Sequence, residues 1–133
     1  MVLNFESLAL HIILIYNNYC CILLPYMITI EDFKKLDIRI GKVISAEKVP
    51  DSDKLIKFIF DIGDEHRQII AGIAEFFPNL TVLIGKEIPL FLNLEPRKFR
   101  GNISDGMIVA ADVNGKPVFL CPEEEVPPGS VVR

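Results

Sequence analysis

The strongest structural signal in this sequence is an alternation of apolar and polar residues over short segments. The segment 56–62 places apolar residues at every second position, with Lys57 and Asp61 between them. The same period recurs over 88–94, where Pro89 falls on the opposite face. A period of two predicts half-buried strands, because successive side chains of a strand point to opposite faces. Since Pro89 lacks the N–H that a sheet ladder uses, we expect the second strand to lie at a sheet edge or to start irregularly.

Turn-forming residues separate further short segments of this kind. Glycine at position 41 predicts a bulge or sharp bend, and Asn114-Gly115 predicts a hairpin turn. The predicted elements are a helix over about 30–36, a helical turn over 74–77, and strands over 38–44, 56–62, 68–73, 88–94, 107–111 and 116–120. Short strands at this regular spacing favour an all-β, five-stranded barrel of the OB type, with a short N-terminal helix and a C-terminal strand extension.

Residues 1–26 differ in composition from the rest of the chain. They contain one acid and no Lys or Arg, whereas the first basic residue is Lys34. A secretory signal needs basic residues at its start, and a membrane helix needs about 20 mostly apolar residues, so we expect neither. Two readings stay open: an element that packs on the domain or on a second subunit, or a start-site artefact with the functional chain beginning at Met27. We favour the second slightly, and both assign function to a domain over 27–133.

The sequence lacks the common motifs of cofactor, metal and nucleophile sites. It has no glycine-rich nucleotide loop, no Cys-x-x-Cys and no pair of His at ligand spacing. Its three cysteines argue against a disulfide framework and favour a reducing, cytoplasmic setting. We therefore expect no enzyme activity, no cofactor and no metal. The net charge of −4 excludes binding to nucleic acid through bulk positive charge, but not through a local patch.

Such a patch is predicted at 96–101, which holds three basic residues around Phe99 between a proline and a glycine. The composition predicts a loop. Guanidinium and ammonium groups can hold phosphates, and an aromatic ring can stack on an unpaired base. A solvated edge of the protein explains three charges equally well, so the segment by itself leaves both readings open.

The longer segment 93–107, Asn-Leu-Glu-Pro-Arg-Lys-Phe-Arg-Gly-Asn-Ile-Ser-Asp-Gly-Met, resembles the hallmark of the tRNA-binding OB-fold family. Segments 37–43, 50–55 and 70–73 are similar to further family motifs, in the family's order. That family includes the C-terminal domain of bacterial methionyl-tRNA synthetases, a free-standing beta chain in some archaea, tRNA-binding dimer proteins and a secretion-chaperone-like branch. The resemblance covers about residues 28–133.

The resemblance implies a barrel that binds the outer corner of folded tRNA, and a homodimer in the free-standing members. The positions that carry over as tRNA-binding candidates are Lys42, Asn93, Arg97, Lys98, Arg100, Ser104 and Met107. Phosphate contacts are expected from the four cations, and directional hydrogen bonds from Asn93 and Ser104. Met107 is expected to pack against a ribose or a base, or alternatively to lie in the core.

The predicted function is that of a non-catalytic, structure-specific tRNA-binding protein, similar to a methionyl-tRNA synthetase beta subunit. Acting in trans, such a module raises tRNA affinity by adding a second contact. The expected partners are tRNA, a second copy of the chain and a synthetase catalytic chain, with no membrane. One alternative is a dimeric chaperone-like protein that binds unfolded polypeptides. Another is a general binder of single-stranded nucleic acid.

Overall fold

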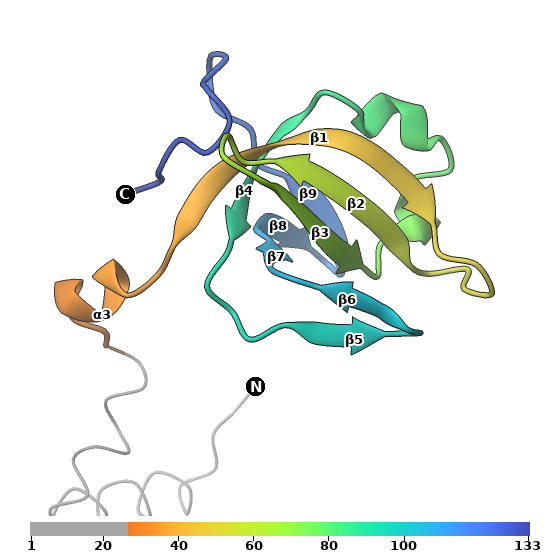
Figure 1. Cartoon of the computed structure of the whole chain (residues 1–133), viewed down its shortest axis with the longest axis horizontal. Helices are drawn as coiled ribbons and strands as arrows, with labels where there is room; N and C mark the ends of the chain where they lie inside the picture. The colour runs from red at the N-terminus through yellow and green to blue at the C-terminus, as the bar shows by residue number, and fades with distance from the viewer. Residues whose placement is uncertain (1–26) are drawn as a thin grey trace, which may run out of the picture. The chain divides into compact units, whose positions relative to one another are not determined.

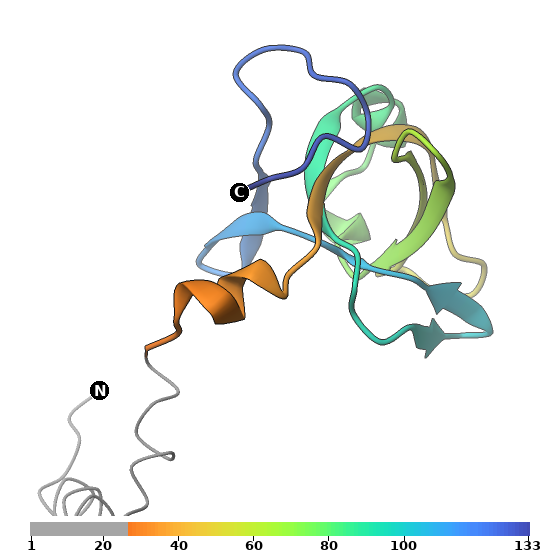
Figure 2. The same ribbon diagram turned by 60° about the vertical axis from the view of Figure 1, so that its left-hand side comes forward.

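The computed structural model describes residues 27–133, of which 36–133 form one compact unit. Its centre is a five-stranded antiparallel sheet in the order β3-β2-β1-β4-β7. The strands are β1 (Ile38–Lys48), β2 (Ile56–Asp61), β3 (His66–Ala71), β4 (Glu87–Phe91) and β7 (Met107–Ile108). Figures 1 and 2 show that the sheet curls strongly round on itself.

The sheet closes into a barrel where the chain after β4 returns to β3. A short hairpin, β5 (Arg97–Phe99) and β6 (Asn102–Ser104), follows β4 and lies beside β3. The Gln68 side chain donates to the carbonyl of Ile103 at 2.8 Å, and the Gln68 carbonyl accepts from the N–H of Asp105, also at 2.8 Å. These two bonds join the outer edge of β3 to the hairpin and to the residue that follows it. The predicted all-β barrel of the OB type is thereby confirmed.

The alternating segments supply the core, as their period predicts, except for Leu94, which lies beyond the end of β4 and is exposed. Ile56, Phe58, Phe60 and Ile62 are all buried, and the rings of Phe58 and Phe60 stack with centroids 5.5 Å apart. The alternate residues of the second segment, Ile88, Leu90 and Leu92, face the same interior. Full burial of one such side chain stabilises the fold by about 1.5–3 kcal/mol, so this interior is the main source of the barrel's stability.

Strand β1 is long because it pairs with two neighbours in succession. Residues 38–42 pair with β4, and residues 42–48 pair with β2. The register shifts between Val43 and Ser45, so the predicted bulge at Gly41 is wrong by a few residues. Gly41 has a different role: a Cβ there would overlap Cδ1 of Leu90 and lie 3.2 Å from the Phe60 ring. The glycine therefore permits close packing inside the barrel.

The expected edge position of the strand around Pro89 is also wrong, because β4 lies between β1 and β7. Pro89 is paired with Ile40, whose backbone groups bond instead to Gly129 and Ser130 in the C-terminal segment. On its other side, the Pro89 carbonyl accepts from Val109 at 2.9 Å. Proline has no N–H to return a second bond, and the ladder between β4 and β7 ends there.

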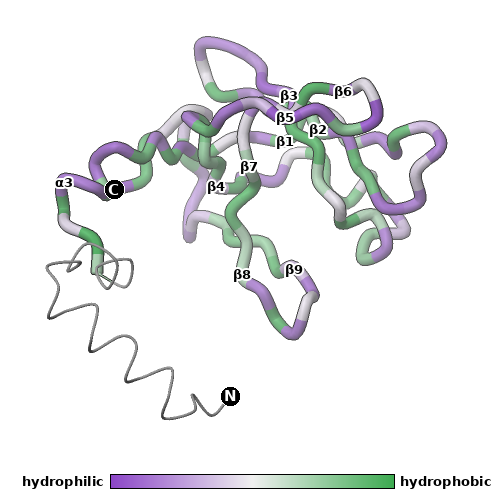
Figure 3. The backbone as a smooth tube through the Cα atoms, turned by 90° about the horizontal axis from the view of Figure 1, so that it is seen from below, coloured by the Kyte–Doolittle hydropathy of each residue, from purple (hydrophilic) through white to green (hydrophobic). Residues whose placement is uncertain are grey.

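After β7 the chain forms a separate two-stranded ribbon, β8 (Ala110–Val113) and β9 (Lys116–Phe119). The predicted Asn114-Gly115 turn joins the two strands, with φ values of 52° and 84°. Phe119 of the ribbon stacks on Phe77, with ring centroids 5.0 Å apart. Figure 3 shows the ribbon projecting from the barrel away from β5 and β6. The C-terminal residues then pair with β1 through a bridge between Arg39 and Val131, as the expected strand extension.

The helices are short. Two 3-10 turns, η2 (Ala74–Phe76) and η3 (Leu80–Leu83), connect β3 to β4. The predicted N-terminal helix is α3 (Ile30–Lys34), which lies outside the compact unit. A capping box of Thr29 and Asp32 begins it. Hydrogen bonds from Lys35 and Thr29 lower the pKa of Asp32 to about 2. Within residues 27–133, no helix has the length and apolar character needed to cross a membrane.

Candidate nucleic-acid interface

The basic segment forms a tight β-hairpin, where the sequence predicted a loop. Phe99 pairs with Asn102, which leaves only Arg100 and Gly101 in the turn. Both turn residues have positive φ, 46° and 82°, as a type I′ hairpin requires. Glycine adopts this conformation readily, whereas an arginine there is held by the pairing of the two flanking strands. The cations therefore sit on a fixed scaffold.

The geometry of the hairpin places its three cations on different sides. Arg97 and Phe99 share one face of β5 and line a groove beside the hairpin. Lys98 lies on the opposite face, where it pairs with the 56% exposed Ile103. Arg100 occupies the turn. A ligand that contacts all three cations must therefore wrap around the hairpin, as an extended phosphate backbone can.

The three cations of the hairpin are unpaired, as Lys86 and Lys116 also are, whereas six other Lys and Arg side chains of the described chain form ion pairs. Among residues 27–133, none of Arg97, Lys98 and Arg100 forms an ion pair. By contrast, Arg39 bonds to Asp37 at 2.8 Å, and this hydrogen bond and the charge of Asp37 raise the pKa of the Arg39 guanidinium. The hairpin thus presents positive charge that no carboxylate of the described chain neutralises, which suits phosphate binding.

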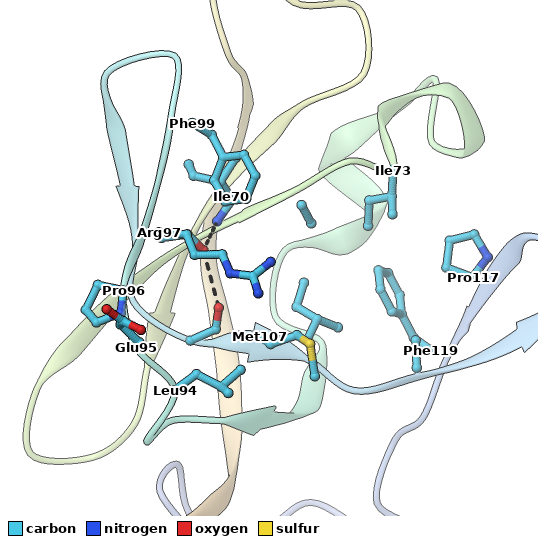
Figure 4. Close-up of a pocket in the computed structure, with 15 residues that line it drawn as sticks. Ile70, Ile73, Leu94, Glu95, Pro96, Arg97, Phe99, Met107, Pro117 and Phe119 are labelled. Carbon is cyan, nitrogen blue, oxygen red and sulfur yellow. Dashed lines mark hydrogen bonds between the residues drawn. The ribbon is translucent and has the colours of Figure 1, made fainter.

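The groove beside the hairpin is mostly apolar and has a volume of about 770 Å³. The hairpin and the residues before it form one wall, and the β8–β9 ribbon, through Pro117 and Phe119, forms the other (Figure 4). Ile70 of β3 and Met107 of β7 lie between these walls. Sequence reasoning missed the ribbon wall. The signal was present in the alternation of β9, which places Pro117 and Phe119 on the same face.

Ser104 and Met107 both line this groove, in different ways. Met107 is 48% exposed, which sets aside the alternative of a core position and leaves its side chain available to a ligand. Ser104 is only 5% exposed. Its hydroxyl accepts from the N–H of Ile70 at 3.0 Å and donates to the carbonyl of Gly106 at 3.3 Å (Figure 4, dashed lines). The structure thus gives Ser104 a bonding role within the fold, and its contact with tRNA stays a prediction.

Asn93 and Lys42 lie outside the groove. Asn93 accepts a 2.7 Å hydrogen bond from the N–H of Asp37 and so ties the end of β4 to the start of β1. Lys42 lies 3.2 Å from a carboxylate oxygen of Glu125 and lines a separate hollow with Glu87 and the acidic C-terminal segment 121–125. The structure therefore brings Arg97, Ser104 and Met107 together and leaves Lys42 in an acidic setting. Phosphate binding by Lys42 stays a prediction.

No metal centre accompanies this site in the part of the chain that the structure describes. Among residues 27–133, no three His, Cys, Asp or Glu side chains gather as metal ligands. Cys121 is exposed and is not in a disulfide.

The fold and the site define an OB-type barrel with an unpaired basic hairpin beside an apolar groove. A family model described as "Putative tRNA binding domain" matches residues 38–131, which is more than half of the chain. The chain belongs to this tRNA-binding domain family. The predicted resemblance is confirmed.

Individual relatives agree with this assignment. The chain is 58% identical over 105 residues to a methionine–tRNA ligase of Archaeoglobus fulgidus, in a match that covers 79% of this chain and 16% of the ligase. The chain thus spans about one sixth of the length of that relative. A solved MetRS-related protein from Pyrococcus horikoshii is 39% identical with a TM-score of 0.76, covering 80% of this chain and 98% of that one. The chaperone CsaA of Bacillus anthracis is 31% identical with a TM-score of 0.73, covering 80% and 99%.

Proposed function

We propose that this chain is a non-catalytic tRNA-binding protein that acts in trans with a methionyl-tRNA synthetase. The observation that carries the proposal is the β5–β6 hairpin, whose three cations are unpaired within residues 27–133 although the whole chain has a net charge of −4. Membership of the tRNA-binding domain family supports tRNA as the ligand. The similarity to a solved chain that the match covers almost completely supports a free-standing barrel.

In this function the hairpin contacts the phosphate backbone of folded tRNA, and its cations displace the counterions condensed on the phosphates. Binding then weakens as salt rises, because the entropy gained by releasing counterions is smaller when the salt concentration in solution is higher. A rigid hairpin on a closed barrel reads the shape of the backbone, since phosphate contacts position a protein without reporting sequence directly. As an accessory subunit, the module would raise the effective tRNA concentration at a synthetase. The proposal includes a homodimer working in the cytoplasm.

A second candidate is a chaperone-like protein that binds unfolded polypeptides. Two observations favour it: the similarity to CsaA of Bacillus anthracis and the apolar groove between the hairpin and the ribbon. An exposed apolar surface of this kind can receive apolar side chains of another chain. Binding of that sort depends little on salt, which separates it from tRNA binding.

The deciding experiment is a filter or mobility-shift titration of bulk folded tRNA at two salt concentrations. An unfolded polypeptide and a single-stranded DNA serve as competitors. Saturable, salt-sensitive binding that neither competitor displaces supports the tRNA-binding function. Displacement by single-stranded DNA would point to a general binder of unpaired nucleic acid. Absence of tRNA binding together with capture of the unfolded polypeptide would replace the proposal with the chaperone-like function. Light scattering of the same sample measures the oligomeric state.

A further inference from the structure

Strand β6 has the reverse of the polarity that a strand packed on a barrel normally shows. Such a strand buries its apolar side chains and exposes its polar ones. In β6 the polar Ser104 is buried, whereas its neighbour Ile103 is 56% exposed. An isoleucine on the outer face therefore contributes little to the packing of the barrel.

Two hydrogen bonds to β3, which lies beside β6 (Figure 1), fix this arrangement. The Gln68 side chain donates to the Ile103 carbonyl at 2.8 Å. The Ile70 N–H donates to the Ser104 hydroxyl at 3.0 Å. A slip of one residue would turn Ile103 inward, but it would exchange the faces of the whole strand and break both bonds. The exposure of the isoleucine is thus built into the register of the hairpin.

The exposed isoleucine lies among the unpaired cations of the hairpin. Lys98 is its cross-strand partner, so the two side chains share one face. Arg100 occupies the adjoining turn. Neither cation forms an ion pair within residues 27–133. The outer face of the hairpin therefore combines an apolar side chain with two charges that can hold phosphates.

A nucleotide with an unstacked base carries the matching groups. Its phosphate is anionic, and the face of its base is flat and largely apolar. Aliphatic side chains, isoleucine among them, pack against bases in this way in nucleic-acid complexes. A polypeptide would need acidic side chains on both sides of an apolar one to match the same face, whereas every nucleotide carries a phosphate. The charge and polarity of this face thus favour RNA.

We propose that Ile103 packs against an unstacked base of folded tRNA while Lys98 and Arg100 hold phosphates of the same strand. This inference rests on the proposed function and deepens it, because it adds an apolar contact to recognition of the backbone. A fully paired RNA covers the faces of its bases and cannot make this contact. Ile103 is then a residue that selects folded tRNA over a plain duplex.

The test uses the full chain and the variants Ile103→Val and Ile103→Thr. Both variants keep a β-branched side chain, which suits the strand, and they differ by one methyl group exchanged for a hydroxyl. We expect Ile103→Val to bind folded tRNA within about twofold of the wild type, and Ile103→Thr to bind it about threefold or more weakly. The slope of log affinity against log salt should stay the same, because no charge is removed.

Val82→Thr is the matched control. Val82 is 55% exposed, belongs to η3 and lies outside the hairpin, so the same exchange of methyl for hydroxyl should leave tRNA affinity unchanged there. Equal urea midpoints of all the variants establish that each is folded. A fully paired RNA duplex at low salt is the second ligand, and its affinity should not change in Ile103→Thr.

Three results would each overturn the inference: equal tRNA affinities of Ile103→Val and Ile103→Thr, an equal loss with the duplex, or a loss confined to binding of an unfolded polypeptide. The duplex result would place the contact on the sugar–phosphate backbone, and the polypeptide result would assign this face to the chaperone-like function. If the wild type binds folded tRNA with a steep salt dependence, the proposed function stands without this inference. If the wild type does not bind folded tRNA, both are wrong.

Discussion

The hydroxyl of Ser104 accepts a 3.0 Å hydrogen bond from the backbone N–H of Ile70. Ser104 belongs to β6 and Ile70 to β3, so this side chain replaces a backbone carbonyl at the point where the barrel closes. Both residues are buried. The bond therefore holds the basic hairpin against the barrel and satisfies a donor that water cannot reach.

Ser104→Ala should destabilise the fold by about 1–3 kcal/mol, because the buried N–H of Ile70 loses its acceptor. Urea unfolding followed by circular dichroism measures this change. Ser104→Thr keeps the hydroxyl and serves as the control, with a smaller loss expected. Unchanged stability of Ser104→Ala would show that the hydroxyl contributes nothing to closure. At a temperature where both proteins are folded, we expect Ser104→Ala to lose less tRNA affinity than a variant of the cations.

The contribution of the hairpin cations is tested by the double variant Lys98→Ala with Arg100→Ala. Loss of two phosphate contacts should lower tRNA affinity at least tenfold and reduce the slope of log affinity against log salt by about 2. Lys86→Ala with Lys116→Ala is the matched control. These lysines are also exposed and outside the ion pairs of residues 27–133, and they lie outside the hairpin.

The control has the same net charge as the test variant, so a change confined to the test variant reports the hairpin itself. Mobility shift at several salt concentrations supplies both quantities. Undiminished binding by Lys98→Ala with Arg100→Ala would remove the hairpin from the interface. Equal losses in the two double variants would mean that only net charge matters.

Gly41→Ala should cost about 1–3 kcal/mol of stability, because the new methyl group would overlap the fully buried Leu90. Leu90→Val shortens the opposing side chain and should recover part of the loss. A double-mutant cycle by urea unfolding measures the coupling, which we expect to exceed about 0.5 kcal/mol. Simple additivity would show that the cost of Gly41→Ala arises elsewhere in the strand.

A chain that begins at Met27 should fold and bind tRNA as the full chain does. All residues of the described core cluster lie between Val43 and Phe119, so the barrel has its own hydrophobic interior. We expect the same urea midpoint and a dissociation constant within about twofold, given the scatter of context effects. Aggregation or loss of binding would instead assign residues 1–26 to the folded protein.

Much of the fold followed from local patterns. The period of two in 56–62 predicted both the strand and its buried face, because a strand has only two faces and one of them must avoid water. Asn114-Gly115 predicted its turn for an equally local reason, the positive φ values that these residues tolerate. The cluster of Arg97, Lys98 and Arg100 stood out by its charge alone, and the family motif favoured tRNA contact over a solvated edge.

The errors occurred where a residue's role depends on what lies across from it. Pro89 can lie inside the sheet because the backbone N–H and carbonyl of its partner Ile40 bond to the C-terminal segment instead of to Pro89. Gly41 leaves room for the side chain of Leu90 and does not form the predicted bulge. Neither neighbour is adjacent in sequence, so no local rule could have identified them.

The sequence by itself determined the class of this protein: alternation and turn residues specify a small antiparallel barrel, and one motif specifies its family. Only the tertiary structure decided what each motif residue does. It placed Arg97 in the groove and Lys98 on the opposite face, buried the hydroxyl of Ser104, and set Lys42 beside Glu125. Residue types and their order are local properties, whereas burial and pairing arise from segments that meet when the barrel closes.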